Sequence, residues 1–282
     1  MRSFLAFLFG VAAVLATLLA VPAMWVSHNV ANEDGYVAFA EPIARDAGFH
    51  DALANALSES LVQDSALPAS LHPVAKAAIV RNANQVSDQP GFVTAWNDTQ
   101  RQSHKIMLGD QRSLPAELDS SSRFAIDLAP LGTFVVKEVN KDVPFTIPAP
   151  DQAVVEINGA PQTQTLDRVR ESPTYARNGL IAVGVFALLT LAFARCRSGA
   201  VAWLGLGALV AAGLLKVATS VGLPAILDRN TAPTPFAKAA LDVFIDRANV
   251  SFDHWLVVVA IGGVVAAATG AAARLLTSRS GV

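Results

Sequence analysis

Residues 4–26 read FLAFLFGVAAVLATLLAVPAMWV, an apolar run that decides the fold of this chain. A run of about 20 apolar residues is long enough to cross the hydrocarbon core of a bilayer as one helix. Three similar runs follow, at Asn178–Ala194, Ser198–Leu223 and Trp255–Ala273. The sequence therefore predicts a mainly α-helical membrane protein with four transmembrane helices.

The hydrophilic segments between these runs differ in charge. All 23 Asp and Glu lie in two segments, 19 in Ser27–Arg177 and four in Asp228–His254. The other hydrophilic pieces contain no acid and five arginines, namely Arg2, Arg195, Arg197, Arg274 and Arg279. Because cytoplasmic loops are enriched in Lys and Arg, both termini and the 195–197 turn are predicted to be cytoplasmic, and the two acidic segments extracytoplasmic.

The predicted order of segments follows from these boundaries. It is a transmembrane helix at 4–26, an extracytoplasmic α-rich domain at 27–177, transmembrane helices at 178–194 and 198–223, an extracytoplasmic loop at 228–254, a transmembrane helix at 255–273 and a cytoplasmic tail at 274–282. Multi-pass insertion in the plasma membrane is the expected localisation.

The first apolar run has a second interpretation, a cleaved signal peptide. Val21-Pro22-Ala23 satisfies a small-x-small cleavage pattern. The run is longer than a signal-peptide core and continues to Trp25, where an interfacial aromatic anchor belongs. An uncleaved anchor is therefore favoured, and cleavage stays open.

The composition of the large outer domain restricts the classes of partner that it can bind. Its 19 acidic and 12 basic residues give a net charge of −7, whereas nucleic-acid binding needs clusters of Lys and Arg. The only cysteine of the chain, Cys196, lies in the short 195–197 turn, so the outer domain cannot contain a disulfide. No nucleic-acid partner is expected. Membrane lipids are expected partners.

Periodicity in the outer domain indicates helices first and mixed structure later. Apolar residues recur at helical spacing over five segments, namely 35–47, 49–64, 71–86, 92–108 and 131–140. Short strands are expected at Phe124–Leu128 and Ala153–Ile157, and a polar helix at 162–171. Two strands separated by a helix could pair in parallel. The domain is thus predicted to be mainly helical with a small β element.

The second outer segment contains an amphipathic helix. Thr234-Pro235 has the form of a cap followed by Pro at the first helical position. Apolar residues of 236–248 then form one stripe. This helix either lies flat on the outer leaflet or packs on the large domain, and its mixed charges favour packing on protein.

Lys216 is the one ionisable residue inside a predicted span. An intramembrane charge is costly and is a candidate functional residue. Lys216 lies close to the outer end of its span, so its amine could instead extend to the headgroups or form a structural pair. A transport role would need polar groups facing it, and the other spans offer few, such as Thr190 and Thr269.

Small residues follow helical spacing in the last two spans. Gly262, Ala266 and Gly270 form a small-xxx-small stripe, and Gly207 and Ala211 a shorter one. Such stripes allow close helix approach in lipid. Packing among the four spans is the simpler interpretation, and an interface with a partner or a second copy is the alternative.

The remaining chemistry of the sequence does not indicate an enzyme. His28, His50, His72 and His104 have no metal-ligand spacing, and no cofactor motif, nucleophile elbow or Ser-x-x-Lys occurs. We therefore expect no cofactor, no metal and no catalytic residues. An outer-domain hydrolase assembled from His104 and Asp127 is the least favoured possibility, since Asp127 fits a helix cap better than a catalytic acid.

From Tyr36 onward the chain resembles a family of uncharacterised four-span integral membrane proteins of actinobacteria. The resemblance rests on Asp88–Val93, followed by Trp96 and His104, and on Ile126-Asp127-Leu128-Ala129-Pro130-Leu131. It implies the four-span topology and an actinobacterial envelope, and it implies no activity.

The sequence thus favours a non-enzymatic membrane protein that binds a partner, acts as a scaffold or senses the envelope through its outer domain. Candidate partners are a second membrane protein or another copy of the chain. The alternative is a small transporter or channel component that uses Lys216.

Overall fold

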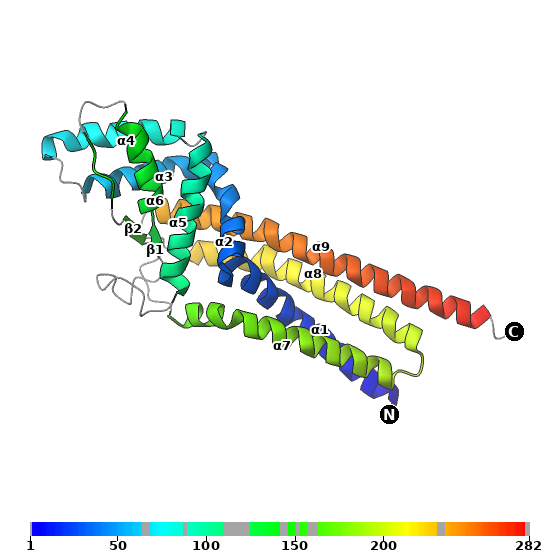
Figure 1. Cartoon of the computed structure of the whole chain (residues 1–282). Helices are drawn as coiled ribbons and strands as arrows, with labels where there is room; N and C mark the ends of the chain where they lie inside the picture. Colours follow the sequence, from blue (N-terminus) through cyan, green and yellow to red (C-terminus); the bar gives the residue numbers. More distant parts are fainter. Residues whose placement is uncertain are drawn as a thin grey trace. The chain divides into compact units, whose positions relative to one another are not determined.

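The computed structural model describes residues 2–63, 68–86, 89–109, 125–141, 146–150, 153–156, 163–229 and 235–279. The fold is mainly α-helical, as predicted (Figure 1). The long helices are α1 (Arg2–Val26), α7 (Thr163–Phe193), α8 (Arg197–Arg229) and α9 (Pro235–Arg279). The shorter elements are α2 (Glu33–Ala40), α3 (Ala47–Gln63), α4 (His72–Val86), α5 (Pro90–Leu108), β1 (Ala125–Asp127), α6 (Ala129–Val139) and β2 (Val154–Glu156).

The chain divides into two compact units. The span unit comprises Met1–His28, Val169–Asp228 and Ala248–Val282. The polar unit comprises Asn29–Arg168 and Arg229–Arg247. Each unit is therefore built from segments that are far apart in the sequence.

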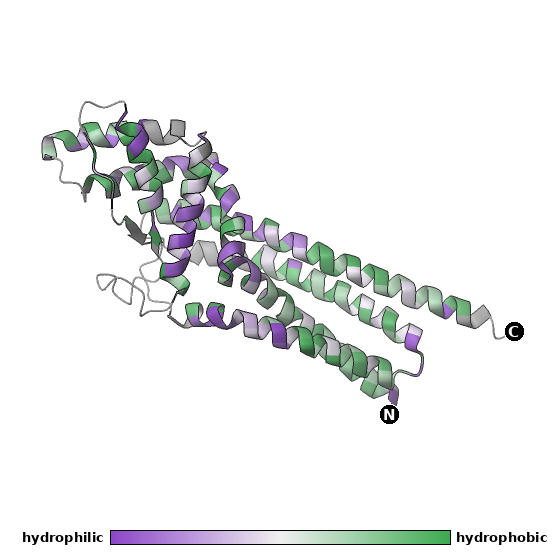
Figure 2. Cartoon of the chain, viewed as in Figure 1, coloured by the Kyte–Doolittle hydropathy of each residue, from purple (hydrophilic) through white to green (hydrophobic). Residues whose placement is uncertain are grey.

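Four helices are long and apolar enough to cross a membrane, which confirms the four predicted spans by length and composition. They are Arg2–Ala31, Thr165–Phe193, Arg197–Gly222 and Phe236–Leu276. Figure 2 shows hydrophobic residues along much of α1, α7, α8 and α9. Large apolar side chains such as Leu19, Leu188 and Val258 are about 70% exposed. Contiguous exposed apolar surface of this kind suits contact with lipid.

Two of the long helices join segments that the sequence analysis treats separately. In α7 the helix passes through Pro173 into the span. In α9 the predicted amphipathic helix and the last span form one helix of 45 residues. No Pro or Gly occurs between Pro235 and Trp255, so nothing in the sequence interrupts the helix there.

The polar unit has its own hydrophobic core. Leu57 of α3, Ile79 of α4, Trp96 of α5 and Val135 of α6 are each 2% exposed or less. The first turns of α9 join this core through Phe236, which is 5.8 Å from Phe49 between ring centroids. The amphipathic stripe therefore packs on protein rather than lying free.

Two short strands pair in the polar unit. Ile126 of β1 is opposite Val155 of β2, and the pairing is antiparallel. The parallel pairing considered from the sequence is wrong. The Leu128 backbone N–H donates to the carbonyl of Ala153 (2.8 Å), so the chain enters β2 at the end where it left β1. The intervening helix α6 does not act as a parallel crossover.

Candidate functional site

Lys216, the predicted intramembrane charge, forms an ion pair with Asp253. Its Nζ donates to both carboxylate oxygens of Asp253, at 2.8 Å to Oδ1 and 2.6 Å to Oδ2. Lys216 belongs to α8 and Asp253 to α9. Asp253 lies near the end of the segment 228–254, which the sequence predicts as an outer loop. The missed signal is the uninterrupted helical pattern of α9, which continues the helix through this position.

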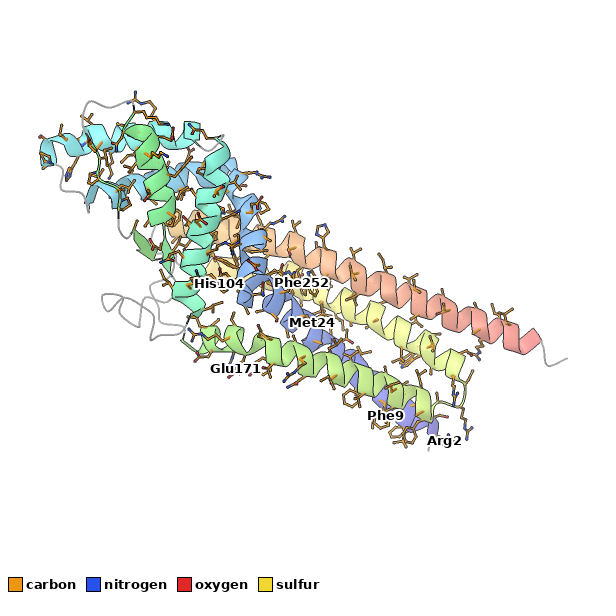
Figure 3. All side chains as sticks on the ribbon, viewed as in Figure 1. Arg2, Phe9, Met24, His104, Glu171 and Phe252 are labelled. Atoms are coloured by element: carbon orange, nitrogen blue, oxygen red, sulfur yellow. The ribbon has the colours of Figure 1, made fainter. Side chains whose placement is uncertain are left out.

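Aromatic side chains lie beside this ion pair in the span unit. The Trp25 indole N–H donates to the hydroxyl of Ser251 (3.1 Å), and its ring meets Phe252 edge-on at 6.0 Å. Leu215 and Phe252, which directly precede Lys216 and Asp253 in the sequence, belong to a small apolar cluster. Figure 3 labels Phe252 on α9. Trp residues near the ends of transmembrane helices are typical of the membrane–water interface.

The level of the ion pair follows from helix geometry. At 1.5 Å per residue, Lys216 lies about 28 Å along α8 from Arg197, and Asp253 about 32 Å along α9 from Arg274. The hydrocarbon core of a bilayer is about 30 Å thick. The arginines and the ion pair are therefore spaced like the two boundaries of one hydrocarbon layer. This spacing predicts Lys216 at an edge of the layer rather than in its middle.

The exposure of the pair limits its contribution to stability. The side chains of Lys216 and Asp253 are 52% and 39% exposed. An ion pair that solvent or headgroups reach contributes about 0–1 kcal/mol. Thr190 and Thr269, the polar residues considered in the other spans, donate to the backbone carbonyls of Phe186 and Val265 in their own helices. Neither of these bonds is directed at Lys216.

Glycines bring α8 and α9 into backbone contact. A Cβ added at Gly205 would lie 2.4 Å from the Ala267 nitrogen, and one at Gly270 would lie 2.4 Å from the Ala202 nitrogen. Of the predicted stripe, Gly270 is therefore in the helix contact. Gly262 is exposed, and a Cβ there would meet no described atom within 4 Å. Its neighbour Gly263 faces α8 instead, since a Cβ added there would lie 2.9 Å from the Gly205 oxygen.

Ala266 is half-buried. Because Gly263 rather than Gly262 faces α8, the predicted stripe is one residue out of position at its first member. The shorter stripe faces α1, since a Cβ at Gly207 would lie 2.7 Å from Val14. Ala211 is fully buried. Small residues in these helices thus serve packing within the chain, and Gly262 lies on the outside.

Asp127 of the polar unit is buried and engaged with backbone. It is 4% exposed, and its Oδ1 accepts hydrogen bonds from the backbone N–H of Ala129 (3.0 Å) and Ala153 (3.1 Å). Its own N–H donates to Ser103 Oγ (3.0 Å). The carboxylate therefore holds the start of α6 and the segment before β2 together. This agrees with a capping role.

His104 is bound in the same interior. Its Nε2 lies 3.0 Å from the Val30 carbonyl, and its ring is 5.3 Å from that of Tyr36. Figure 3 labels His104 on α5. Burial raises the pKa of Tyr36 to about 12. His104 and Asp127 each hold backbone groups, and their described hydrogen bonds do not join them into one pair.

Arg101 forms a surface charge cluster that the sequence does not predict. Its Nη1 donates to Asp34 Oδ1 (2.9 Å) and Glu33 Oε1 (3.3 Å) at the start of α2. The hydrogen bonds to Asp34 and then Glu33 raise the pKa of Arg101. The guanidinium thereby ties α5 to α2. Residues this far apart in sequence give no spacing signal.

The described part of the chain contains no group of three His, Cys, Asp or Glu placed to hold a metal ion. No family model, no curated protein and no solved structure matches the chain.

Proposed function

We propose that the chain is a multi-pass plasma-membrane protein that works without catalysis. Its polar unit lies outside the cytoplasm and binds a partner, acts as a scaffold or senses an envelope component. The observation that carries this proposal is the engagement of Asp127 and His104. These two residues, the candidates for a hydrolase site, are used to hold backbone groups of the polar unit.

The orientation is supported by charge. The arginines at residues 2, 195, 197, 274 and 279 lie in pieces without acids, and such pieces stay in the cytoplasm. The polar unit contains most of the acidic residues and is then on the opposite side. An actinobacterial envelope remains a prediction from the sequence resemblance.

Helix α9 offers a route by which a binding event could be signalled. Its first turns contribute Phe236 and Ala240 to the core of the polar unit. Its later turns contribute Phe252 and Leu256 to the apolar cluster of the span unit. A change in packing around Phe236 would thus act on a helix that continues into a span.

Crosslinking in intact cells tests the proposal. A photoreactive residue at Asp98, exposed on α5, is expected to capture a partner in stoichiometric yield. The same residue at Leu188, which is 68% exposed on α7, is the matched control for lipid-facing surface. Partners are identified by mass spectrometry after gentle solubilisation. Recovery of the chain alone from the Asp98 variant contradicts the scaffold role.

One observation favours a second function, that of a small transporter or channel component. Asp253 supplies the charged partner for Lys216 that the sequence analysis lacked. The level of the pair at the edge of the hydrocarbon layer favours an interfacial anchor over a conduction path. If Lys216→Met leaves the cellular phenotype unchanged in a well-folded protein, transport through this residue is excluded.

A further inference from the structure

A hollow lies at the arginine-rich end of the span unit, opposite the ion pair along the helices. It has a volume of about 320 Å³ and is formed by α1, the α7–α8 turn and α8. Its lining includes Ala6, Phe7, Arg195, Cys196, Ala200 and Trp203. In Figure 3, Arg2 and Phe9 are labelled at this end of the unit, near the α7–α8 turn.

The hollow has one charged edge and apolar walls. Arg195 forms no salt bridge with any described residue, and Ser3 adds a hydroxyl to the lining. Phe7 and Trp203 form the apolar wall, with ring centroids 5.9 Å apart. They are 52% and 44% exposed, which leaves a broad aromatic surface open.

The electrostatic surroundings of the hollow favour an anion. No Asp or Glu occurs between Glu171 and Asp228 or after Asp253, and the first 32 residues also contain none. At the α7–α8 turn, a hydrogen bond with Ser198, another from the Gly199 backbone and the charge of Arg274 lower the pKa of Cys196. The last of these contributions places a second guanidinium near the turn.

We propose that this hollow binds one anionic phospholipid. The phosphate lies on the unpaired Arg195 guanidinium with Ser3 as a second donor, and an acyl chain runs along Phe7 and Trp203. Basic recesses between transmembrane helices recognise anionic headgroups in this way. The level fits, because the arginines mark one boundary of the hydrocarbon layer. A free phosphate ion would satisfy Arg195 and leave the aromatic wall uncovered.

Lipid titration of the full-length protein in mild detergent, followed by native mass spectrometry, tests the site. Phosphatidylglycerol is expected to bind as one retained lipid, in preference to phosphatidylcholine of equal chain length. Arg195→Gln should weaken its binding at least tenfold, because the charge-assisted hydrogen bond to the phosphate is lost. Ala6→Leu fills the hollow without changing charge and should also weaken it.

Arg197→Gln is the matched control. It removes the same charge two residues away, and Arg197 does not line the hollow. Its effect should stay below about fivefold, the contribution of one basic residue near an anionic surface. Equal losses for the two arginine variants would reduce the site to general electrostatic attraction. Equal retention of phosphatidylcholine, or displacement by millimolar inorganic phosphate, would also overturn the proposal.

Discussion

The span unit and the polar unit are stabilised by different kinds of contact. In the span unit, α8 and α9 meet backbone to backbone at Gly205 and Gly270, and large apolar side chains remain exposed. In the polar unit, apolar side chains are buried around α5 and α6, and Asp127 satisfies backbone groups inside. Lipid removes the need to bury apolar surface, so small residues and close backbones decide the packing of the span unit.

The largest expected effect is in the polar unit. Asp127→Ala leaves the buried N–H groups of Ala129 and Ala153 without their acceptor, which should lower the free energy of unfolding by about 3 kcal/mol. Hydrogen exchange of the full-length protein should show lost protection around β1, β2 and the start of α6. Asp127→Asn retains an acceptor oxygen and should cost less.

The exposed Asp98 on α5 provides the control for this substitution. Asp98→Ala should leave exchange in β1 and α6 unchanged. If Asp127→Ala were equally harmless, the buried carboxylate would not hold the polar unit together, and a chemical role for Asp127 would need to be considered again.

The second-largest expected effect is a loss of stability of the polar unit at high pH. The folded-state pKa of Tyr36 is raised to about 12 by burial, above the ordinary value near 10. Its contribution to stability is therefore complete below pH 10 and is lost as the pH rises through 12. The difference of about two pH units corresponds to about 2–3 kcal/mol.

Absorbance titration measures this effect directly, since the chain has only two tyrosines. In a Tyr175→Phe background, the remaining phenol should ionise near pH 12, together with unfolding of the polar unit. Tyr36→Phe should remove this component of the pH dependence. Ionisation near pH 10 in the folded protein would show that Tyr36 is accessible.

A glycine pair sharpens the comparison in the span unit. Gly205→Leu places a side chain against the α9 backbone and should destabilise the packing of α8 on α9 by about 2 kcal/mol. Gly262→Leu adds the same atoms into open space and should have almost no effect in detergent. Thermal unfolding of the two variants checks this, and equal destabilisation would place Gly262 in a contact with a second copy.

The Lys216–Asp253 ion pair should make the smallest contribution to the free energy of unfolding. Lys216→Met removes the bidentate pair with Asp253, yet the half-exposed position predicts a loss of no more than about 1 kcal/mol. Chemical denaturation compares it with Lys216→Met/Asp253→Leu, which removes both charges. A loss of several kcal/mol in the single variant would show that the pair is shielded from headgroups and water.

The two units also differ in how much the sequence predicts. The spans follow from runs such as residues 4–26, because length and apolar character suffice in lipid. The helix contact is harder, since Gly262 and Gly263 are indistinguishable in a small-residue pattern and only the rotation of α9 separates them. The ion pair was missed because α8 and α9 bring together residues that are 37 positions apart.

In the polar unit, helical spacing predicts α3 to α6, and the turn chemistry of 126–131 predicts the cap by Asp127. The antiparallel pairing and the contact of Arg101 with α2 depend on tertiary geometry. Asp88, the predicted cap at Thr234, and Phe124 and Ile157 at the ends of the two predicted strands lie outside the described residues.

We propose that the polar unit and the α7–α8 turn lie on opposite sides of the membrane. Because Cys196 is the only cysteine, it reports on the turn without any substitution. In a Cys196→Ser background, Ser70→Cys reports on an exposed position of the polar unit. A membrane-impermeant maleimide applied to intact cells is expected to label Ser70→Cys at once, and Cys196 only after permeabilisation. Labelling of Cys196 in intact cells, with Ser70→Cys protected, would contradict this orientation.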